Sequence, residues 1–366
     1  MSAAPALSGA PNDRYLGLPT QPHFEMDAAH SSRAALGKRL FFDKHLSGNG
    51  EISCATCHAP TRALSDGRSL AVGINGKRGT RNTPTLWDSA YMSSFFWDGR
   101  SVALTNQAIN PLLNPREQGL RNTGQLLDSI RRSPAYRSAF STTFGGASDS
   151  ISVRNVTRAL AAYEETLVAG DSPFDRYLYG HETHAMSAAA IRGFELFRGR
   201  AGCSSCHTIN SRYALFTDGE FHDEGVGFGL LATKLAMAAV RVAHTPAGEL
   251  DQLITSDSMV AALGRFVQTK DPHDIGKFRT PTLRNVALTA PYMHDGSIST
   301  LLQAIDFEIY YQGLHSKRPL ILTPNERSDI LAFLDELTSP AASNLSSPSN
   351  TQRSQLVGSS SRRTGT

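Results

Sequence analysis

Residues 36–58 read LGKRLFFDKHLSGNGEISCATCH, and residues 191–207 read IRGFELFRGRAGCSSCH. In both stretches, G-x-x-L-F precedes a glycine-containing turn, and the turn leads into C-x-x-C-H. The apolar residues ahead of each turn lie near helical spacing; they are Leu36, Leu40 and Phe41 in the first stretch and Ile191, Phe194 and Phe197 in the second. The chain therefore contains an internal repeat of helix, turn and cysteine motif.

The cysteine motifs identify a cofactor. The chain has only four cysteines, and all of them lie in these two motifs, with a histidine after each pair: Cys54, Cys57 and His58, then Cys203, Cys206 and His207. Two cysteines separated by two residues can each bond one vinyl group of a haem, and the adjacent histidine then binds the iron from the proximal side. A zinc ribbon or a redox-active thiol pair is the alternative interpretation. Zinc would not require a histidine after both pairs, and thiol pairs would not use every cysteine, so the pattern predicts two covalently bound c-type haems.

Composition narrows the class of protein. At 366 residues with 19% charged residues, the chain is long enough for two domains. The net charge of +3 and the scattered basic residues argue against nucleic-acid binding. No stretch approaches eighteen consecutive apolar residues, so we expect no membrane span, and no signal peptide is visible. Because bacteria attach c-type haem outside the cytoplasm, we expect a periplasmic protein whose leader this sequence omits.

We predict a mainly α fold made of two cytochrome c-like haem domains with long ordered loops. Residues 153–168 (VRNVTRALAAYEETLV) contain neither proline nor glycine and predict a helix that closes the first domain. Thr323 and Glu326 form a capping box with Pro324 at the first helical position, which predicts a last helix running to Leu337. The predicted parts are an extended arm at 1–28, an N-terminal domain at 29–168, a C-terminal domain at 169–338 and a disordered tail at 339–366.

Between Leu36 and Leu337 the sequence resembles the bacterial di-haem cytochrome c peroxidases and their MauG-type relatives. Besides the two haem motifs, the matching stretches are GTRNTPTL, FFWDGR, INPLLNPREQG, DSPFDRYL and FRTPTLRNVALTAPYMHDGS. The resemblance implies that hydrogen peroxide reacts at the N-terminal haem and that the C-terminal haem transfers or stores electrons.

The resemblance also assigns residues at the N-terminal haem. It makes Trp97 the bridge between the haems, although a packed core aromatic is the commoner role of a buried tryptophan. It places Glu117 as the group that moves the proton of peroxide, Gln107 as the amide that orients it, and Pro111 as part of the distal wall. An isolated Glu or Gln in a loop is more often solvated, so these assignments depend on the resemblance.

Two positions depart from the activation-dependent peroxidases. Where many relatives block the N-terminal haem with a loop histidine, this chain has Ile74, and residues 69–82 contain no histidine. We therefore expect a five-coordinate N-terminal haem. Relatives supply Met or Tyr as distal ligand of the second haem; an ungapped count from His294 reaches Glu308, and two inserted residues would align Tyr310 instead. We prefer Tyr310, with Glu308 as the alternative.

The resemblance further implies a calcium ion between the domains, bound by Asn82, Thr289, Pro291 and water. Oxygen ligands suit calcium, but residue types alone would not predict this site. His294 is expected to pack near the second haem, where it could bond a propionate.

Three functions remain open. The first is a peroxidase that takes electrons from a small c-type cytochrome or a cupredoxin. The second is a MauG-type oxidant that modifies Trp or Tyr residues of a partner protein. The third is an electron-transfer cytochrome with both irons saturated, against which the missing loop histidine argues. A homodimer, as many relatives form, is a further expectation from the resemblance.

Overall fold

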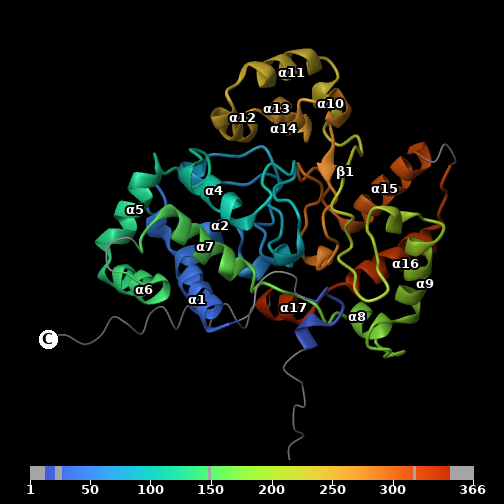
Figure 1. The fold of residues 1–366 in the computed structure, drawn as a ribbon. Helices are drawn as coiled ribbons and strands as arrows, with labels where there is room; N and C mark the ends of the chain where they lie inside the picture. Colours follow the sequence, from blue (N-terminus) through green and yellow to red (C-terminus); the bar gives the residue numbers. More distant parts are fainter. Residues whose placement is uncertain (1–12, 21–26, 147–149, 316–318, 347–366) are drawn as a thin grey trace, which may run out of the picture.

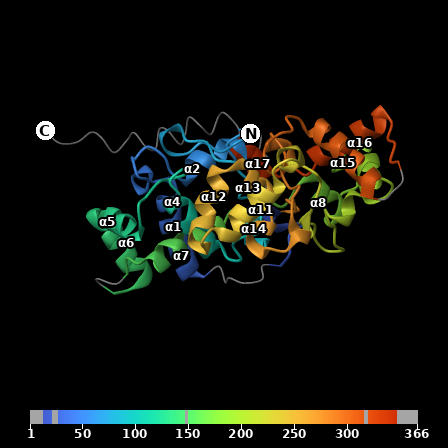
Figure 2. The same ribbon diagram turned by 90° about the horizontal axis from the view of Figure 1, so that it is seen from above.

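The computed structural model describes residues 13–20, 27–146, 150–315 and 319–346. It has two helical halves side by side and a smaller group of helices over their junction (Figure 1). Seen from above, that group again lies between the two halves (Figure 2). The expectation of a mainly α fold is confirmed. In the described residues the strands form one short antiparallel pair, β1 (Phe221–His222) with β2 (Phe278–Arg279).

The N-terminal half is built from seven helices: α1 (Ala28–Phe42), α2 (Cys54–Cys57), α3 (Leu104–Gln107), α4 (Ile109–Leu113), α5 (Thr123–Arg132), α6 (Pro134–Phe144) and α7 (Val153–Glu164). The helices predicted around 36–41 and 153–168 are confirmed as α1 and α7. Their apolar residues form one hydrophobic cluster that includes Leu36, Leu40, Phe41 and Leu160.

The C-terminal half repeats this plan with α8 (Pro173–Leu178), α9 (Ala188–Arg198), α15 (Leu301–His315) and α16 (Pro324–Asp335). The capping box predicted for the last long helix is present, because Thr323 and Glu326 bond each other's backbone N–H groups at the start of α16. A second cluster, centred on Phe194, Phe197 and Phe333, fills this half.

The glycine of each G-x-x-L-F stretch marks a helix crossing. A Cβ atom at Gly37 of α1 would collide with the carbonyl oxygen of Ala159 in α7, and one at Gly193 of α9 would collide with that of Asp329 in α16. Only glycine lets these backbones approach so closely. The repeat seen in the sequence is therefore a repeat of two crossed helix pairs.

A second repeat lies in the loops at the junction. Residues 82–101 and 279–298 follow the same path: Asp88 and Asn285 both have positive φ, and single antiparallel bridges close Phe95 to Ser101 and Tyr292 to Ile298. The two loops also exchange equivalent backbone bonds. The N–H of Asn82 donates to the carbonyl of His294 at 2.8 Å, and that of Arg279 donates to the carbonyl of Trp97 at 2.8 Å. The halves therefore meet around a pseudo-twofold axis.

The helices over the junction break this symmetry. They are α10 (Phe228–Leu231), α11 (Leu235–His244), α12 (Leu250–Ser256), α13 (Ser258–Ala262) and α14 (Phe266–Thr269). They enclose a third hydrophobic cluster that includes Val242, Ile254 and Leu263. We call residues 228–269 the cap segment.

The predicted tail needs a correction. Residues 340–346 form a helix, α17 (Pro340–Ser346), so the prediction of disorder from residue 339 onward is wrong for this stretch. Ala342 is fully buried against the first core, and the N–H of Ser339 donates to the Asn285 side chain at 2.9 Å. Residues 347–366, like most of the predicted arm, lie outside the described residues. The described part of the arm is ordered, since the carbonyl of Leu16 accepts a bond from Asp171 N–H at 3.0 Å.

Candidate active site

The first cysteine motif opens onto a cavity with about 1560 Å³ of empty space, part of it open to solvent. Cys54, Cys57 and His58 line it, together with Phe41 of α1 and Leu160 of α7. The crossed helices therefore form one wall of this cavity.

The second motif opens onto an equivalent cavity of about 1700 Å³, also partly open to solvent. Cys203, Cys206 and His207 line it, with Phe197 of α9 and Ile330 of α16. Each half thus places its cysteine motif and one face of its helix pair around a cavity of its own.

Both histidines are held in one orientation. The His58 Nδ1 atom lies 3.0 Å from the carbonyl oxygen of Leu64, and the His207 Nδ1 atom lies 2.9 Å from that of Phe216. Burial lowers the pKa of both imidazoles, which favours the neutral form. A neutral imidazole that donates through Nδ1 keeps Nε2 as a metal ligand.

The cysteines are those of an attachment site. All four are unpaired, and burial raises the pKa of Cys54, Cys57 and Cys203 to about 12. Redox-active motifs have instead a cysteine whose pKa is lowered. This environment disfavours the thiol-redox alternative.

Arg279 supplies an independent test of fit for haem. It lines both cavities, its Nε is buried without a hydrogen-bond partner, and its Nη1 contacts the Met92 sulfur at 3.7 Å. Burial lowers its pKa to about 10, and no carboxylate of the described residues offsets this shift. A buried guanidinium without a carboxylate is costly. The propionates of a haem are carboxylates, so the cavities and this charge fit two haems.

Trp97 stands between the cavities. It lines both of them, and its Nε1 donates to the carbonyl of Asn82 at 3.0 Å, which fixes the ring. In the loop repeat its equivalent is His294, which lines the second cavity and stacks on Phe278 with ring centroids 3.6 Å apart. Burial and then Arg81 lower the pKa of His294 to about 3. His294 is therefore neutral.

The three predicted distal residues come together in the first cavity. Gln107 of α3, Pro111 of α4 and Glu117 of the following turn all line it. Burial, followed by the charge of Asp251, raises the pKa of Glu117 to about 7, against the opposing effect of Arg100. A carboxyl group that titrates near neutral pH can accept and return a proton.

Among the described residues lining the first cavity, the only histidine is His58. Ile74 is buried and does not line the cavity, because its side chain packs beside Gly48 and Gly119. This packing accords with an open distal position at the N-terminal haem, which stays a prediction.

The two alternatives for the second distal ligand lie apart. Glu308 lines the second cavity, whereas Tyr310 does not line it and is 63% exposed. Two residues along a helix turn a side chain by about 200°, and α15 is continuous across both positions. The structure therefore favours Glu308 over Tyr310, the reverse of the preference drawn from the sequence. Burial, then Glu224, raises the pKa of Glu308 to about 8.

The residues predicted for calcium also lie together. Asn82, Thr289 and Pro291 line the second cavity near the junction of the halves. The Asn82 Nδ2 donates to the carbonyl of Arg68 at 2.8 Å, which leaves its amide oxygen as a ligand. The calcium site stays a prediction.

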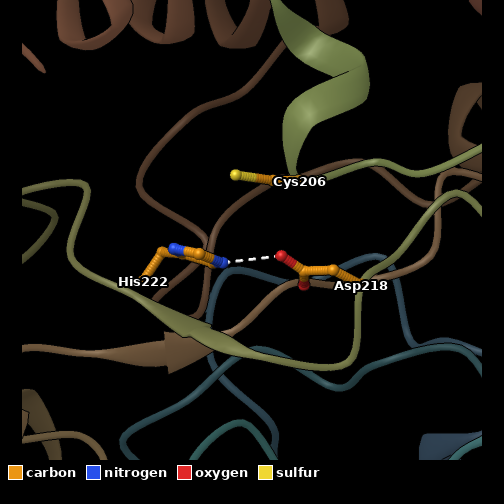
Figure 3. A group of neighbouring side chains, drawn as sticks. All are labelled: Cys206, Asp218 and His222. Carbon is orange, nitrogen blue, oxygen red and sulfur yellow. Dashed lines mark hydrogen bonds and ion pairs between the residues drawn. The ribbon is translucent and has the colours of Figure 1, made fainter.

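Cys206, Asp218 and His222 form a cluster at the second cavity (Figure 3). The His222 Nε2 and an Asp218 carboxylate oxygen are 2.7 Å apart. Three such groups could bind a metal ion, but Cys206 belongs to C-x-x-C-H and is required for a thioether bond. We interpret His222, which Asp218 holds in place, as part of the wall beside the second haem.

Sequence reasoning missed two acidic residues near the first cavity. Glu164 lines it from α7 and is 5% exposed, and its Oε2 has no hydrogen-bond partner. Asp251 reaches its wall from the cap segment. The position of Glu164 in the predicted helix could have identified the first; nothing local in the sequence marks the second.

Comparisons with known proteins agree with this geometry. A family model described as di-haem cytochrome c peroxidase matches residues 31–183. The methylamine utilization protein MauG of Methylorubrum extorquens is 35% identical over 88% of this chain and 82% of its own. The cytochrome-c peroxidase IdrP1 of Pseudomonas sp. strain SCT is 33% identical over 88% of this chain and 84% of its own. A solved MauG-like protein associated with microbial copper homeostasis matches with a TM-score of 0.71 and 30% identity, covering 94% of this chain and 98% of that one.

Proposed function

The chain belongs to the di-haem cytochrome c peroxidase family, and we propose that it reduces hydrogen peroxide to water with electrons from a small redox protein. The observation that carries this proposal is the asymmetry of the two cavities. Each is lined by a C-x-x-C-H motif, but Gln107, Pro111 and Glu117, to which the family resemblance assigns the reaction with peroxide, line only the first.

In this proposal His58 and His207 bind the two haem irons, and the four cysteines form the thioether bonds. When bound, the N-terminal haem supplies the iron at which peroxide is reduced. Glu117 takes the proton of peroxide and returns it to the departing oxygen, while the Gln107 amide orients the substrate. Trp97, fixed between the cavities, provides the path for electrons from the second haem.

We propose Glu308 as the distal ligand of the second haem, because it is the carboxylate that lines that cavity from α15. An anionic oxygen ligand stabilises the ferric state and lowers the reduction potential. Calcium bound by Asn82, Thr289 and Pro291 is part of the same proposal. The loop repeat supports a positive charge there, since the equivalents of Asn82 and Thr289 are Arg279 and Met92, which touch each other.

A second candidate is oxidation of aromatic residues of a partner protein, as in the MauG-type interpretation. The observation in its favour is that a carboxylate, Glu308, lines the second cavity from α15, where relatives supply Met or Tyr. An anionic oxygen ligand would make the second haem a poorer acceptor of electrons. The structure identifies no protein substrate.

The surroundings of the protein are also proposals. The described residues contain no helix long and apolar enough to cross a membrane. A periplasmic location follows from the chemistry of c-type haem attachment, and the electron donor would be a c-type cytochrome or a cupredoxin. Dimerisation stays an expectation from the family.

Glu117→Gln tests the proposed function. The amide keeps the size of the side chain but cannot accept a proton, so kcat/KM for hydrogen peroxide should fall by about 10²–10⁴-fold. The assay is peroxide-dependent oxidation of a reduced small cytochrome c by the di-haem protein. Wild-type activity should also decline below about pH 7, where Glu117 becomes protonated. A variant as active as wild type would exclude the role of Glu117, and an inactive wild type would exclude the peroxidase.

A further inference from the structure

The cap segment reaches the first cavity although it belongs to the C-terminal half. Ile254 and Thr255 of α12 line that cavity. Thr80 Oγ1 donates to the carbonyl of Ile254 at 2.6 Å, and Arg81 Nη2 donates to that of Ala261 at 2.8 Å. The segment therefore forms part of the cavity wall.

One carboxylate at this contact has two partners from different parts of the N-terminal half. Arg100 Nε donates to Asp251 Oδ1 at 2.8 Å, and Asn114 Nδ2 donates to Asp251 Oδ2 at 2.9 Å. The Arg100 and Asn114 residues are both nearly inaccessible, with 8% side-chain exposure for Arg100 and 3% residue exposure for Asn114. Each oxygen of Asp251 therefore fixes a different buried group.

Both partners lie beside the groups that we propose to react with peroxide. Arg100 lines it, stacks over Phe96 with 3.4 Å between the guanidinium carbon and the ring centroid, and also pairs with Asp98 at 3.1 Å. Asn114 holds the turn that carries Glu117, because its carbonyl accepts the N–H of Glu117 at 3.0 Å and its side chain accepts that of Arg116 at 2.9 Å. Movement of Asn114 would move Glu117.

We infer that Asp251 is a positioning residue of the peroxide site, through which the cap segment of the C-terminal half holds Arg100 and the Glu117 turn of the N-terminal half. The inference rests on the proposed function. It explains why the cap segment breaks the pseudo-twofold symmetry: it completes the reactive cavity. At the second cavity, the equivalent of Arg100 is Ser297, which is exposed.

Asp251 also contributes charge. The charged groups on the same cavity are Arg81, Arg100, Arg116, Arg279 and Glu164, with Asp98 and Asp251 behind the first two. Removing the negative charge of Asp251 removes one of the causes that raise the pKa of Glu117. The acidic limb of the activity profile should then move to lower pH.

The test compares Asp251→Asn with Asp257→Asn. Asp257 lies in the same segment and pairs with the exposed Arg241, not with Arg100. For Asp251→Asn we expect kcat/KM for peroxide to fall about 10- to 100-fold, because small displacements of catalytic groups are costly, and the acidic limb to shift downward. Asp257→Asn should match wild type in both respects. Asp251→Glu, which keeps the charge, should have a lower kcat/KM for peroxide, but its activity should decline at the same acidic pH as that of wild type.

Each other outcome is decisive. If wild type reduces peroxide and Asp251→Asn is equally active, the inference is wrong. If Asp251→Asn and Asp257→Asn lose activity alike with an unshifted limb, the segment acts only through stability, and the positioning role is excluded. Should Asp251→Asn fail to retain two haems, an Asp251→Glu protein with wild-type kcat/KM would overturn the inference. An inactive wild type would instead refute the proposed function.

Discussion

The two cavities have the same frame and different chemical groups. In both, crossed helices with a glycine at the contact, a C-x-x-C-H motif and a T-P-T-L loop enclose the space. The first is lined by Glu117, Gln107 and Glu164, whereas the second is lined by Glu308, Glu224, Gln312 and the neutral His294. The shared frame fits binding of the same cofactor twice, and the differing groups fit a division of labour between reaction with peroxide and electron transfer.

The largest expected effect on stability that separates the two cavities is at Glu164. Counted from the helix crossings, its equivalent in α16 is Leu334, which lines the second cavity. Burial raises the pKa of Glu164 to about 8 from an ordinary value of 4.5. The folded state therefore keeps a proton that the unfolded state loses, and stability should fall as pH rises from about 4.5 to about 8.

Replacing Glu164 by its counterpart, as Glu164→Leu, should remove this dependence. At pH 9 the variant should be more stable than wild type by an amount on the order of 4 kcal/mol, relative to their difference at pH 4. Urea unfolding at a series of pH values would measure it. Parallel stability curves for the two proteins would mean that Glu164 is not protonated at neutral pH.

A smaller effect on stability is expected at the two helix crossings, and it should be similar in the two halves. Gly37→Ala and Gly193→Ala each force a Cβ into a backbone carbonyl of the partner helix. Each should destabilise the protein by roughly 1–3 kcal/mol, as overpacking does. Thermal unfolding of the two variants would show whether the pairs are energetically alike. A neutral effect at one glycine would show that its helix pair can move apart, so that the frames differ.

The smallest effect on the free energy of unfolding is expected at an exposed ion pair in the C-terminal half. Arg327 Nη1 lies 2.8 Å from Asp306 Oδ1 between α16 and α15, and both side chains are more than a third accessible. Since such pairs contribute little, Asp306→Asn should change the free energy of unfolding by less than about 1 kcal/mol. A much larger loss would show that α15, and with it Glu308, depends on this contact.

Local patterns predicted the frame well. The apolar spacing of α1 and α9, the uninterrupted α7 and the capping box of α16 are features of single segments, and so are the two haem motifs. The distal residues Glu117, Gln107 and Pro111 and the bridging Trp97 were named from the resemblance, and the structure gathers them at the first cavity.

Contacts between distant segments were not predictable in this way. Helix α17 exists because Ala342 fits a space in the first core, and the short helices of the cap segment depend on their own cluster. Asp251 contacts residues more than a hundred positions away in the sequence. The choice between Tyr310 and Glu308 as distal ligand depended on which face of α15 lines the cavity. The T-P-T-L and D-G repeats of the junction loops were visible in the sequence and could have paired Trp97 with His294 in advance.

The most direct test of the asymmetry between the cavities is an EPR spectrum of the ferric di-haem protein before and after addition of stoichiometric hydrogen peroxide. We expect a high-spin signal from one haem, the one held by His58, that disappears on addition of peroxide without prior reduction. Two low-spin signals that peroxide leaves unchanged would contradict it, because both irons would then be saturated and the first cavity would not be an open peroxide site.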